Sequence, residues 1–241
     1  MIVENSINYY DRIINITLNI IQENIDSKGK CDLMLTGGKT ARLLYRKFSS
    51  KVLNTRNITY YFGDERCVPS DSCDSNFKMV SESLFANGVP SECEVKQING
   101  EVSNVSHELL RYSSLLPKSI DILLLSVGED GHIASLFPLN SHLCNNKERM
   151  LYVSNAPKYP SKRITISPLV IKKAKSIIVM AEGEEKGMVL AKALQNAENV
   201  KDMPVRLTIK KNTIWMLDKS ATLSFQKTGI KNDFNIRIMY A

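Results

Sequence analysis

The sequence lacks the patterns that mark several large classes of protein. Its five cysteines form no CxxC pair or other zinc-type spacing, which predicts free thiols in a reducing compartment. No apolar run approaches the ~20 residues that a bilayer-spanning helix needs. The first residues also lack the basic segment and apolar run of a targeting signal. We therefore expect a cytoplasmic protein with no membrane partner.

Motifs for nucleotides and for covalent catalysis are also missing. Neither GxGxxG nor GxxxxGK followed by Ser or Thr occurs, so no motif supports a nucleotide cofactor. No GxSxG elbow occurs, which favours water over serine as a nucleophile. The net charge of +7 comes from scattered basic residues, and the densest cluster, Lys172, Lys173 and Lys175, is too short for a nucleic-acid arm. We expect no nucleic-acid partner, no metal and no cofactor.

Short apolar runs alternate with helical patterns from end to end. The runs are continuous rather than alternating, as in strands that are buried on both faces of a parallel sheet. We predict a single domain over residues 1–241, a three-layer α/β fold whose mostly parallel sheet carries helices on both faces. The expected strands are 31–36, 57–62, 94–98, 120–127, 150–154, 163–167, 176–181 and, last, 213–217. The expected helices are 5–25, 40–49, 75–85, 102–116, 168–174 and 184–195, with 199–212 as an irregular connection.

A histidine directly follows the most apolar of these strands. Residues 121–138 read DILLLSVGEDGHIASLFP, where a Gly-x-Asp-Gly turn precedes His132 and a segment that can begin a helix follows it. Ligands of open α/β sheets bind at the carboxyl ends of strands, and a neutral imidazole is the natural general base near pH 7. We expect His132 as the base and Asp130 as the group that orients it or binds substrate hydroxyls. The alternative is a histidine that caps the next helix; His107 and His142 are expected to be structural.

A pair of glycines follows the first predicted strand, in the order Thr36-Gly37-Gly38-Lys39-Thr40. Glycines let the backbone approach an anion closely, and the amides that begin the next helix point at it. The two threonine hydroxyls and the lysine ammonium can add donors. The segment predicts a phosphate cradle, against the alternative of a plain strand-to-helix turn.

Charged residues supply the other candidates. Asp64 and Arg66 follow the second predicted strand, where an arginine can clamp an oxyanion with two hydrogen bonds and an aspartate can orient a partner or take a proton. Arg163 follows a proline-containing loop, and Lys186 lies where a helix begins. Both are candidate anion contacts, and solvated surface charge is the alternative for each.

Together and in this order, these segments resemble the 6-phosphogluconolactonase family, a relative of the glucosamine-6-phosphate deaminases. The matching stretches are LTGGKTARLLY (35–45), YFGDERCVPSDSCDSNFKM (61–79), LLLSVGEDGHIASLFP (123–138), APKYPSKRITISPLVIKKAKSIIVMAEGEEK (156–186) and PVRL…IWMLD (204–218). The resemblance implies a Rossmann-like fold. It also implies metal-free hydrolysis of a small sugar-phosphate lactone, 6-phospho-D-glucono-1,5-lactone, to 6-phosphogluconate in the pentose phosphate pathway.

The resemblance also implies roles by position. His132 matches the general base, and the segments that contact substrate and phosphate are matched by Thr36, Gly37, Gly38, Lys39, Thr40, Arg66 and Arg163. From their places in the chain we add Asp130 as the partner of His132, and Asp64, Gly131 and Lys186 as further candidates to bind substrate or phosphate. Which of the four basic residues among them holds the phosphate stays open, as does the oligomeric state. The chain departs from the family pattern in the glycine loop at Thr36, which keeps a hydroxyl, and at Lys39 and Ala41. It also departs at Ser126, where a glycine is often found.

Two other functions are weaker interpretations of the same motifs. A glucosamine-6-phosphate isomerase or deaminase typically has Asp-Glu-Tyr where this chain has Asp64-Glu65-Arg66. It also typically reads Ala-Phe-Asn-Glu-Pro where this chain has Ala134-Ser135-Leu136-Phe137-Pro138, so the acidic residue of that motif is absent here. A non-catalytic sugar-phosphate sensor of a transcriptional regulator would need a helix-turn-helix, for which there is no room before Cys31.

Overall fold

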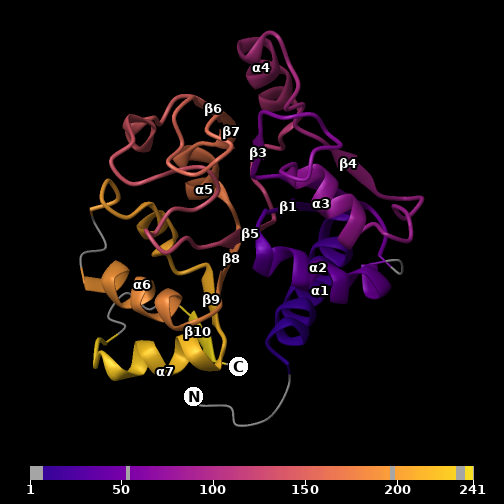
Figure 1. Ribbon diagram of the computed structural model, residues 1–241. Helices are drawn as coiled ribbons and strands as arrows, with labels where there is room; N and C mark the ends of the chain where they lie inside the picture. Colours follow the sequence, from indigo (N-terminus) through magenta and orange to yellow (C-terminus); the bar gives the residue numbers. More distant parts are fainter. Residues whose placement is uncertain (1–7, 53–54, 196–198, 232–236, 241) are drawn as a thin grey trace.

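The fold is built on a parallel sheet of seven strands. The computed structural model describes residues 8–52, 55–195, 199–231 and 237–240 (Figure 1). The sheet has the order β10-β9-β8-β5-β1-β2-β4, and all of its strand pairs are parallel. The strands are β1 (Cys31–Leu35), β2 (Ile58–Phe62), β4 (Glu94–Lys96), β5 (Ile122–Ser126), β8 (Ser176–Ala181), β9 (Thr213–Leu217) and β10 (Arg237–Tyr240). The predicted α/β class is confirmed.

The strand order reverses direction between β1 and β5. From β1 the chain adds β2 and β4 on one side, then returns to place β5, β8, β9 and β10 on the other. Loops leaving two such strands diverge, which opens a crevice at their carboxyl ends. The glycine pair follows β1 and the histidine turn follows β5, so the topology brings both motifs to this crevice.

Helices cover both faces of the sheet, as predicted. Parallel crossovers are right-handed, so helices inserted on the two sides of the reversal lie on opposite faces. Figure 1 shows α1 and α2 on one side of the sheet and α6 and α7 on the other. The helices are α1 (Tyr9–Lys28), α2 (Lys39–Val52), α3 (Asn76–Ser83), α4 (Val105–Leu115), α5 (Pro168–Lys173), α6 (Glu184–Gln195) and α7 (Lys219–Lys227). Two 3₁₀ turns, Ser141–Cys144 and Pro204–Thr208, are the other helical elements of the described residues.

A second, antiparallel sheet of three strands lies outside the main one. Its order is β3-β7-β6, formed by Asp64–Arg66, Arg163–Ile166 and Met150–Val153. The sequence predicted the last two segments as strands but treated the first as charged loop. Local pattern could not identify β3, because three charged or polar residues become a strand only when β7 supplies the hydrogen-bond partner.

Other predictions were wrong in detail. The last strand is β10 rather than β9, and helix α7 was not predicted. The Asp218 carboxylate caps α7 by accepting a hydrogen bond from the Ala221 amide at 2.8 Å.

The segment after His132 begins no helix, because isolated bridges tie Ile133 to Val127 and to Leu136 in a tight turn. Residues 5–7 of the first predicted helix lie outside the described residues. The single-domain organisation stays a prediction.

The core consists of the central strands and the helix faces that pack on them. All five residues of β1 are buried, and Trp215 of β9 is among the largest fully buried side chains. Among the described residues, none of the helices combines the length and apolarity that crossing a bilayer requires. The buried sheet is therefore a rigid base for the loops at its carboxyl edge.

Candidate active site

A cavity of about 410 Å³ opens at the carboxyl ends of β1 and β5. Its lining is Thr36, Gly37, Gly38, Lys39, Thr40, Asp64, Arg66, Ser126, Val127, Gly128, Glu129, His132, Ala134, Lys158, Arg163 and Lys186. The structure thus brings together nearly all of the residues singled out in the sequence. Asp130 and Gly131 are the two that do not line the cavity, and both lie in the turn that carries the histidine.

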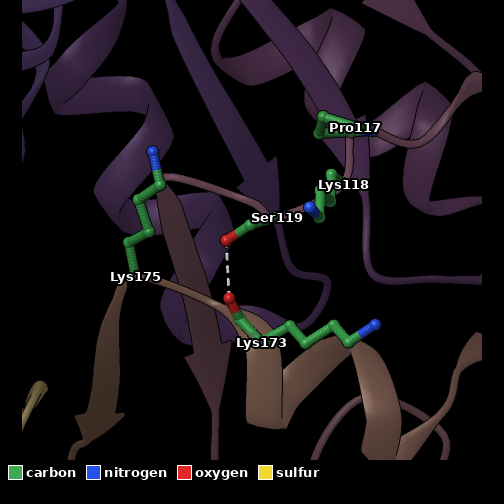
Figure 2. Close-up of a pocket in the computed structure, with 5 residues that line it drawn as sticks. All are labelled: Pro117, Lys118, Ser119, Lys173 and Lys175. Carbon is green, nitrogen blue, oxygen red and sulfur yellow. Dashed lines mark hydrogen bonds between the residues drawn. The ribbon is translucent and has the colours of Figure 1, made fainter.

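Another cavity, of about 490 Å³, lies near the amino ends of β5 and β8 and is lined by Pro117, Lys118, Ser119, Lys173 and Lys175. Figure 2 shows the Lys173 and Lys175 ammonium groups pointing in different directions, while the Ser119 hydroxyl donates to the Lys173 carbonyl at 2.6 Å. These groups do not converge on one ligand. We therefore place the chemistry at the carboxyl edge, where a histidine and several cations face one space.

Asp130 and His132 form a hydrogen-bonded pair at this edge. Their Oδ1 and Nδ1 atoms are 2.5 Å apart, and the same oxygen accepts a hydrogen bond from the His132 amide at 3.1 Å. Burial alone would raise the pKa of Asp130, but the hydrogen bonds from the ring and the amide of His132 lower the pKa to about 2. The ionised carboxylate can only accept hydrogen bonds, so the ring proton lies on Nδ1 and Nε2 is the basic nitrogen.

The turn itself holds the imidazole in place. Gly128 donates to the His132 carbonyl at 2.8 Å, and the Val205 amide donates to the Gly131 carbonyl at 2.8 Å. The His132 ring lies 4.8 Å from the Phe137 ring, centroid to centroid. A Cβ on Gly128 would lie 2.0 Å from His132 Nδ1. Only glycine at this position leaves room for the histidine ring, a constraint that the sequence pattern did not show.

The glycine loop after β1 is held in place by two hydrogen bonds between the buried Tyr45 hydroxyl and the backbone of Thr36. The buried Tyr45 hydroxyl accepts from the Thr36 amide and donates to the Thr36 carbonyl, both at 3.0 Å. Gly38 has a φ of +98°, which suits glycine. The Thr40 hydroxyl donates to Glu182 at 2.9 Å, so its proton is used within the protein. An anion in this loop therefore meets backbone amides and the exposed Lys39 ammonium rather than the Thr40 hydroxyl proton.

Strand β3 places Asp64 and Arg66 in the wall of the same cavity. The buried Asp64 carboxylate accepts from the Ser135 hydroxyl at 2.7 Å. Arg66 Nη1 donates to the Asp74 carbonyl at 2.7 Å, and its buried Nε has no hydrogen-bond partner among the described residues. A guanidinium with unused donors beside a cavity can bind an anion, whereas Asp64 is held as part of the wall.

Glu65, between them, points the other way and caps α3. Its two buried oxygens accept four hydrogen bonds, from the Arg66, Asn76 and Phe77 amides at 2.7 Å each and from the Ser75 hydroxyl at 3.2 Å. Burial raises the pKa of Glu65, and the backbone hydrogen bonds oppose that rise. The carboxylate thus satisfies the free amides of a helix start and ties α3 to β3.

We expect Glu65→Gln to destabilise the fold by about 2–4 kcal/mol, because an amide group replaces one of the accepting oxygens and faces buried donors. Urea unfolding of the variant measures this change. Glu82→Gln is the matched control, since Glu82 lies on α3, the helix that Glu65 caps, and its side chain is 67% exposed. Equal midpoints for the two variants would contradict the capping role of Glu65.

Arg163 lies mostly inside the protein. Its Nε donates to the Pro160 carbonyl at 2.8 Å and its Nη2 to the Lys158 carbonyl at 2.9 Å. The guanidinium also lies 5.6 Å from the centre of the Phe137 ring, and burial lowers the pKa of Arg163. Arg163 therefore donates most of its N–H groups to backbone carbonyls of the loop that precedes it, although the sequence predicted it as an anion contact.

Two lysines complete the positive side of the cavity. Lys186 at the start of α6 is half-buried, and burial lowers its pKa. Lys158, which was not among the site residues predicted from the sequence, comes from the loop between β6 and β7. Neither lysine forms an ion pair with a described carboxylate. The local signal for Lys158 was only a basic residue in a proline-rich loop, and the pairing of β7 with β3 brings that loop to the site.

The fold and cavity define an α/β protein with a histidine–aspartate pair and converging cations at the reversal point of a parallel sheet. This arrangement suits a small anionic ligand. Residues 5–215 match the model of the family described as glucosamine-6-phosphate isomerases/6-phosphogluconolactonase, and the chain belongs to that family. The family that the motifs predicted is thereby confirmed.

Comparison with individual proteins agrees with this family assignment. The chain is similar to the 6-phosphogluconolactonase of Haemophilus influenzae, at 32% identity over 78% of this chain and 85% of the relative. The structure of 6-phosphogluconolactonase from Trypanosoma brucei superposes with a TM-score of 0.75 at 26% identity, covering 89% of this chain and 94% of that one. A monomeric glucosamine-6-phosphate deaminase superposes with a TM-score of 0.71 at 24% identity, covering 93% of this chain and 100% of that one, so the fold is shared with that activity too.

Proposed function

We propose that the protein hydrolyses 6-phospho-D-glucono-1,5-lactone to 6-phosphogluconate, with His132 as the general base. The observation that carries the proposal is the Asp130–His132 pair at a cavity that is also lined by the cations Lys39, Arg66, Lys158 and Lys186. The names of the relatives support the same substrate. The absence of an acidic residue in Ala134-Ser135-Leu136-Phe137-Pro138 favours lactone hydrolysis over deamination.

In the proposed mechanism, neutral His132 takes a proton through Nε2 from a water that attacks C1 of the lactone. The new C–O bond pushes an electron pair onto the carbonyl oxygen, which becomes an oxyanion. The Asp130 carboxylate stabilises the imidazolium that forms. When the oxyanion collapses, the bond from C1 to the ring oxygen breaks, and His132 returns its proton to that oxygen. The products are a carboxylic acid, which ionises, and a free hydroxyl.

The phosphate of the substrate would lie away from the reacting carbon and fix its position. The glycine loop offers backbone amides at the start of α2, and Lys39, Arg66 and Lys186 offer cations. Lys186 is the best candidate among the lysines, because it is half-buried, forms no ion pair with a described carboxylate, and a bound phosphate would compensate that burial. Contacts to the phosphate, at the end of the substrate remote from C1, would hold C1 in the correct orientation relative to His132 and the attacking water.

We expect the purified protein to accelerate the disappearance of the lactone well above its spontaneous hydrolysis. The lactone can be generated in place from glucose 6-phosphate, and the product measured by coupled oxidation of 6-phosphogluconate. Ammonia release from glucosamine 6-phosphate serves as the parallel assay, and we expect none. A rate equal to the spontaneous one, or release of ammonia, would contradict the proposed function.

A further inference from the structure

Lys158 is a cation in the cavity without an assigned role. It lies on the exposed loop between β6 and β7, and its residue lines the cavity together with His132 and Lys186. No described carboxylate forms an ion pair with it. Lys162, on the same loop, is also exposed but does not line the cavity. The loop therefore directs one of its two lysines to the site and leaves the other in solvent.

The backbone of this loop is anchored by buried contacts. Arg163 donates to the carbonyls of Lys158 and Pro160 at 2.9 and 2.8 Å, and the Ala156 amide donates to the Ser161 carbonyl at 2.9 Å. Arg163 is 4% exposed, so its guanidinium keeps these bonds away from competing water. The loop is thus a strap, residues 156–162, whose backbone is held against the start of β7.

Three neighbouring side chains, Arg163, Phe137 and His132, connect this strap to the catalytic pair. The Arg163 guanidinium lies 5.6 Å from the centre of the Phe137 ring, and that ring lies 4.8 Å from the His132 ring. The arginine that holds the Lys158 carbonyl thus shares one aromatic neighbour with the histidine. The Lys158 charge also contributes to lowering the pKa values of Asp130 and Lys186, which agrees with a position near both. Lys39 and Thr36 also line the cavity, but they belong to the glycine loop after β1 and not to the strap.

We propose that the Lys158 ammonium contacts the ligand at C1, stabilising first the oxyanion that forms there and then the carboxylate of the product. This inference rests on the proposed function. In the proposed division of work, Arg163 positions the strap and Lys158 supplies the charge. A positive group placed where negative charge develops lowers the barrier, because it interacts more strongly with the oxyanion than with the neutral lactone.

The experiment compares Lys158→Ala and Lys158→Arg with Lys162→Ala, the matched control on the same strap. Turnover is measured with the lactone. Inhibition constants are measured for 6-phosphogluconate and for glucitol 6-phosphate, which has a hydroxymethyl group in place of the carboxylate. Because both inhibitors carry the same phosphate, their ratio isolates the contact at C1. Since Lys158 is exposed, each variant is expected to fold, which thermal unfolding checks.

We expect Lys158→Ala to lower kcat by about 10–100-fold, which is at or below the lower limit of the roughly 10²–10³-fold loss for a buried oxyanion donor, because Lys158 is exposed. We expect it to weaken 6-phosphogluconate binding about 10-fold while leaving glucitol 6-phosphate unchanged, with partial rescue in Lys158→Arg. Lys162→Ala should match the unsubstituted protein. Unchanged turnover and inhibition would overturn the proposal, as would equal weakening of both inhibitors, which would assign Lys158 to the phosphate. A protein that does not hydrolyse the lactone at all would instead refute the proposed function.

Discussion

His132→Ala lowers kcat by about 10²–10⁴-fold in our expectation, the range that general acid–base catalysis contributes. The reason is that the variant keeps the cavity and its cations but loses the group that takes a proton from water and returns it to the ring oxygen. Affinity for 6-phosphogluconate should change little, because the phosphate contacts lie elsewhere. Turnover with the lactone and product inhibition together measure the two effects.

His107→Ala is the matched control for this prediction. His107 lies on α4, is exposed, and is absent from the cavity lining, so its loss should leave turnover unchanged. Near-normal turnover in His132→Ala would contradict the general-base role. A parallel loss of turnover and of product affinity would show that the substitution disrupts the whole site, and it would equally remove the support for a specific proton transfer.

Gly128→Ala should cost about 10²-fold in turnover without any change in a chemically active group. The added Cβ would lie 2.0 Å from His132 Nδ1, 2.1 Å from its Cε1 and 2.7 Å from Asp130 Oδ1. The imidazole must move away, and a displacement of about 1 Å is enough to cost about 10²-fold in rate. Kinetics with the lactone measure the loss, and thermal unfolding shows whether the fold survives.

Gly229→Ala separates this clash from the general cost of replacing a glycine. Gly229 has a φ of +66° and nothing lies within 4 Å of the Cβ that would be added, so the substitution strains the backbone without touching the site. We expect it to lower stability by about 1 kcal/mol and leave turnover intact. If Gly128→Ala turned over as fast as Gly229→Ala, the ring would have room that the structure does not show.

Much of the main sheet was predictable, since its strands are buried on both faces. Continuous apolar runs such as 120–127 and 176–181 leave few alternatives to a parallel strand, and the structure places β5 and β8 there. Strand β10 was missed because Arg237–Tyr240 is too short and mixed to stand out from sequence alone. The segment after His132, which by its sequence can begin a helix, does not do so, because two bridges from Ile133 hold it in a tight turn.

The sequence by itself determined the family, the class of fold and the motifs that meet at the sheet edge. Those properties are local: a glycine pair after one strand and an Asp-Gly-His turn after another are visible within a few residues. Parallel strands then carry both motifs to the same edge. The pairing of Asp130 with His132 was also foreseeable, since the two residues are neighbours in one turn.

Only the tertiary structure decided what each charged side chain does. Glu65 caps a helix, Arg163 holds a loop, and Lys158 lines the cavity, although all three look alike as surface charge in the sequence. Their roles depend on the pairing of β3 with β7, two segments about 100 residues apart along the chain. Long-range pairing decides which donors are buried and used and which are left for a ligand, and no local pattern records that choice.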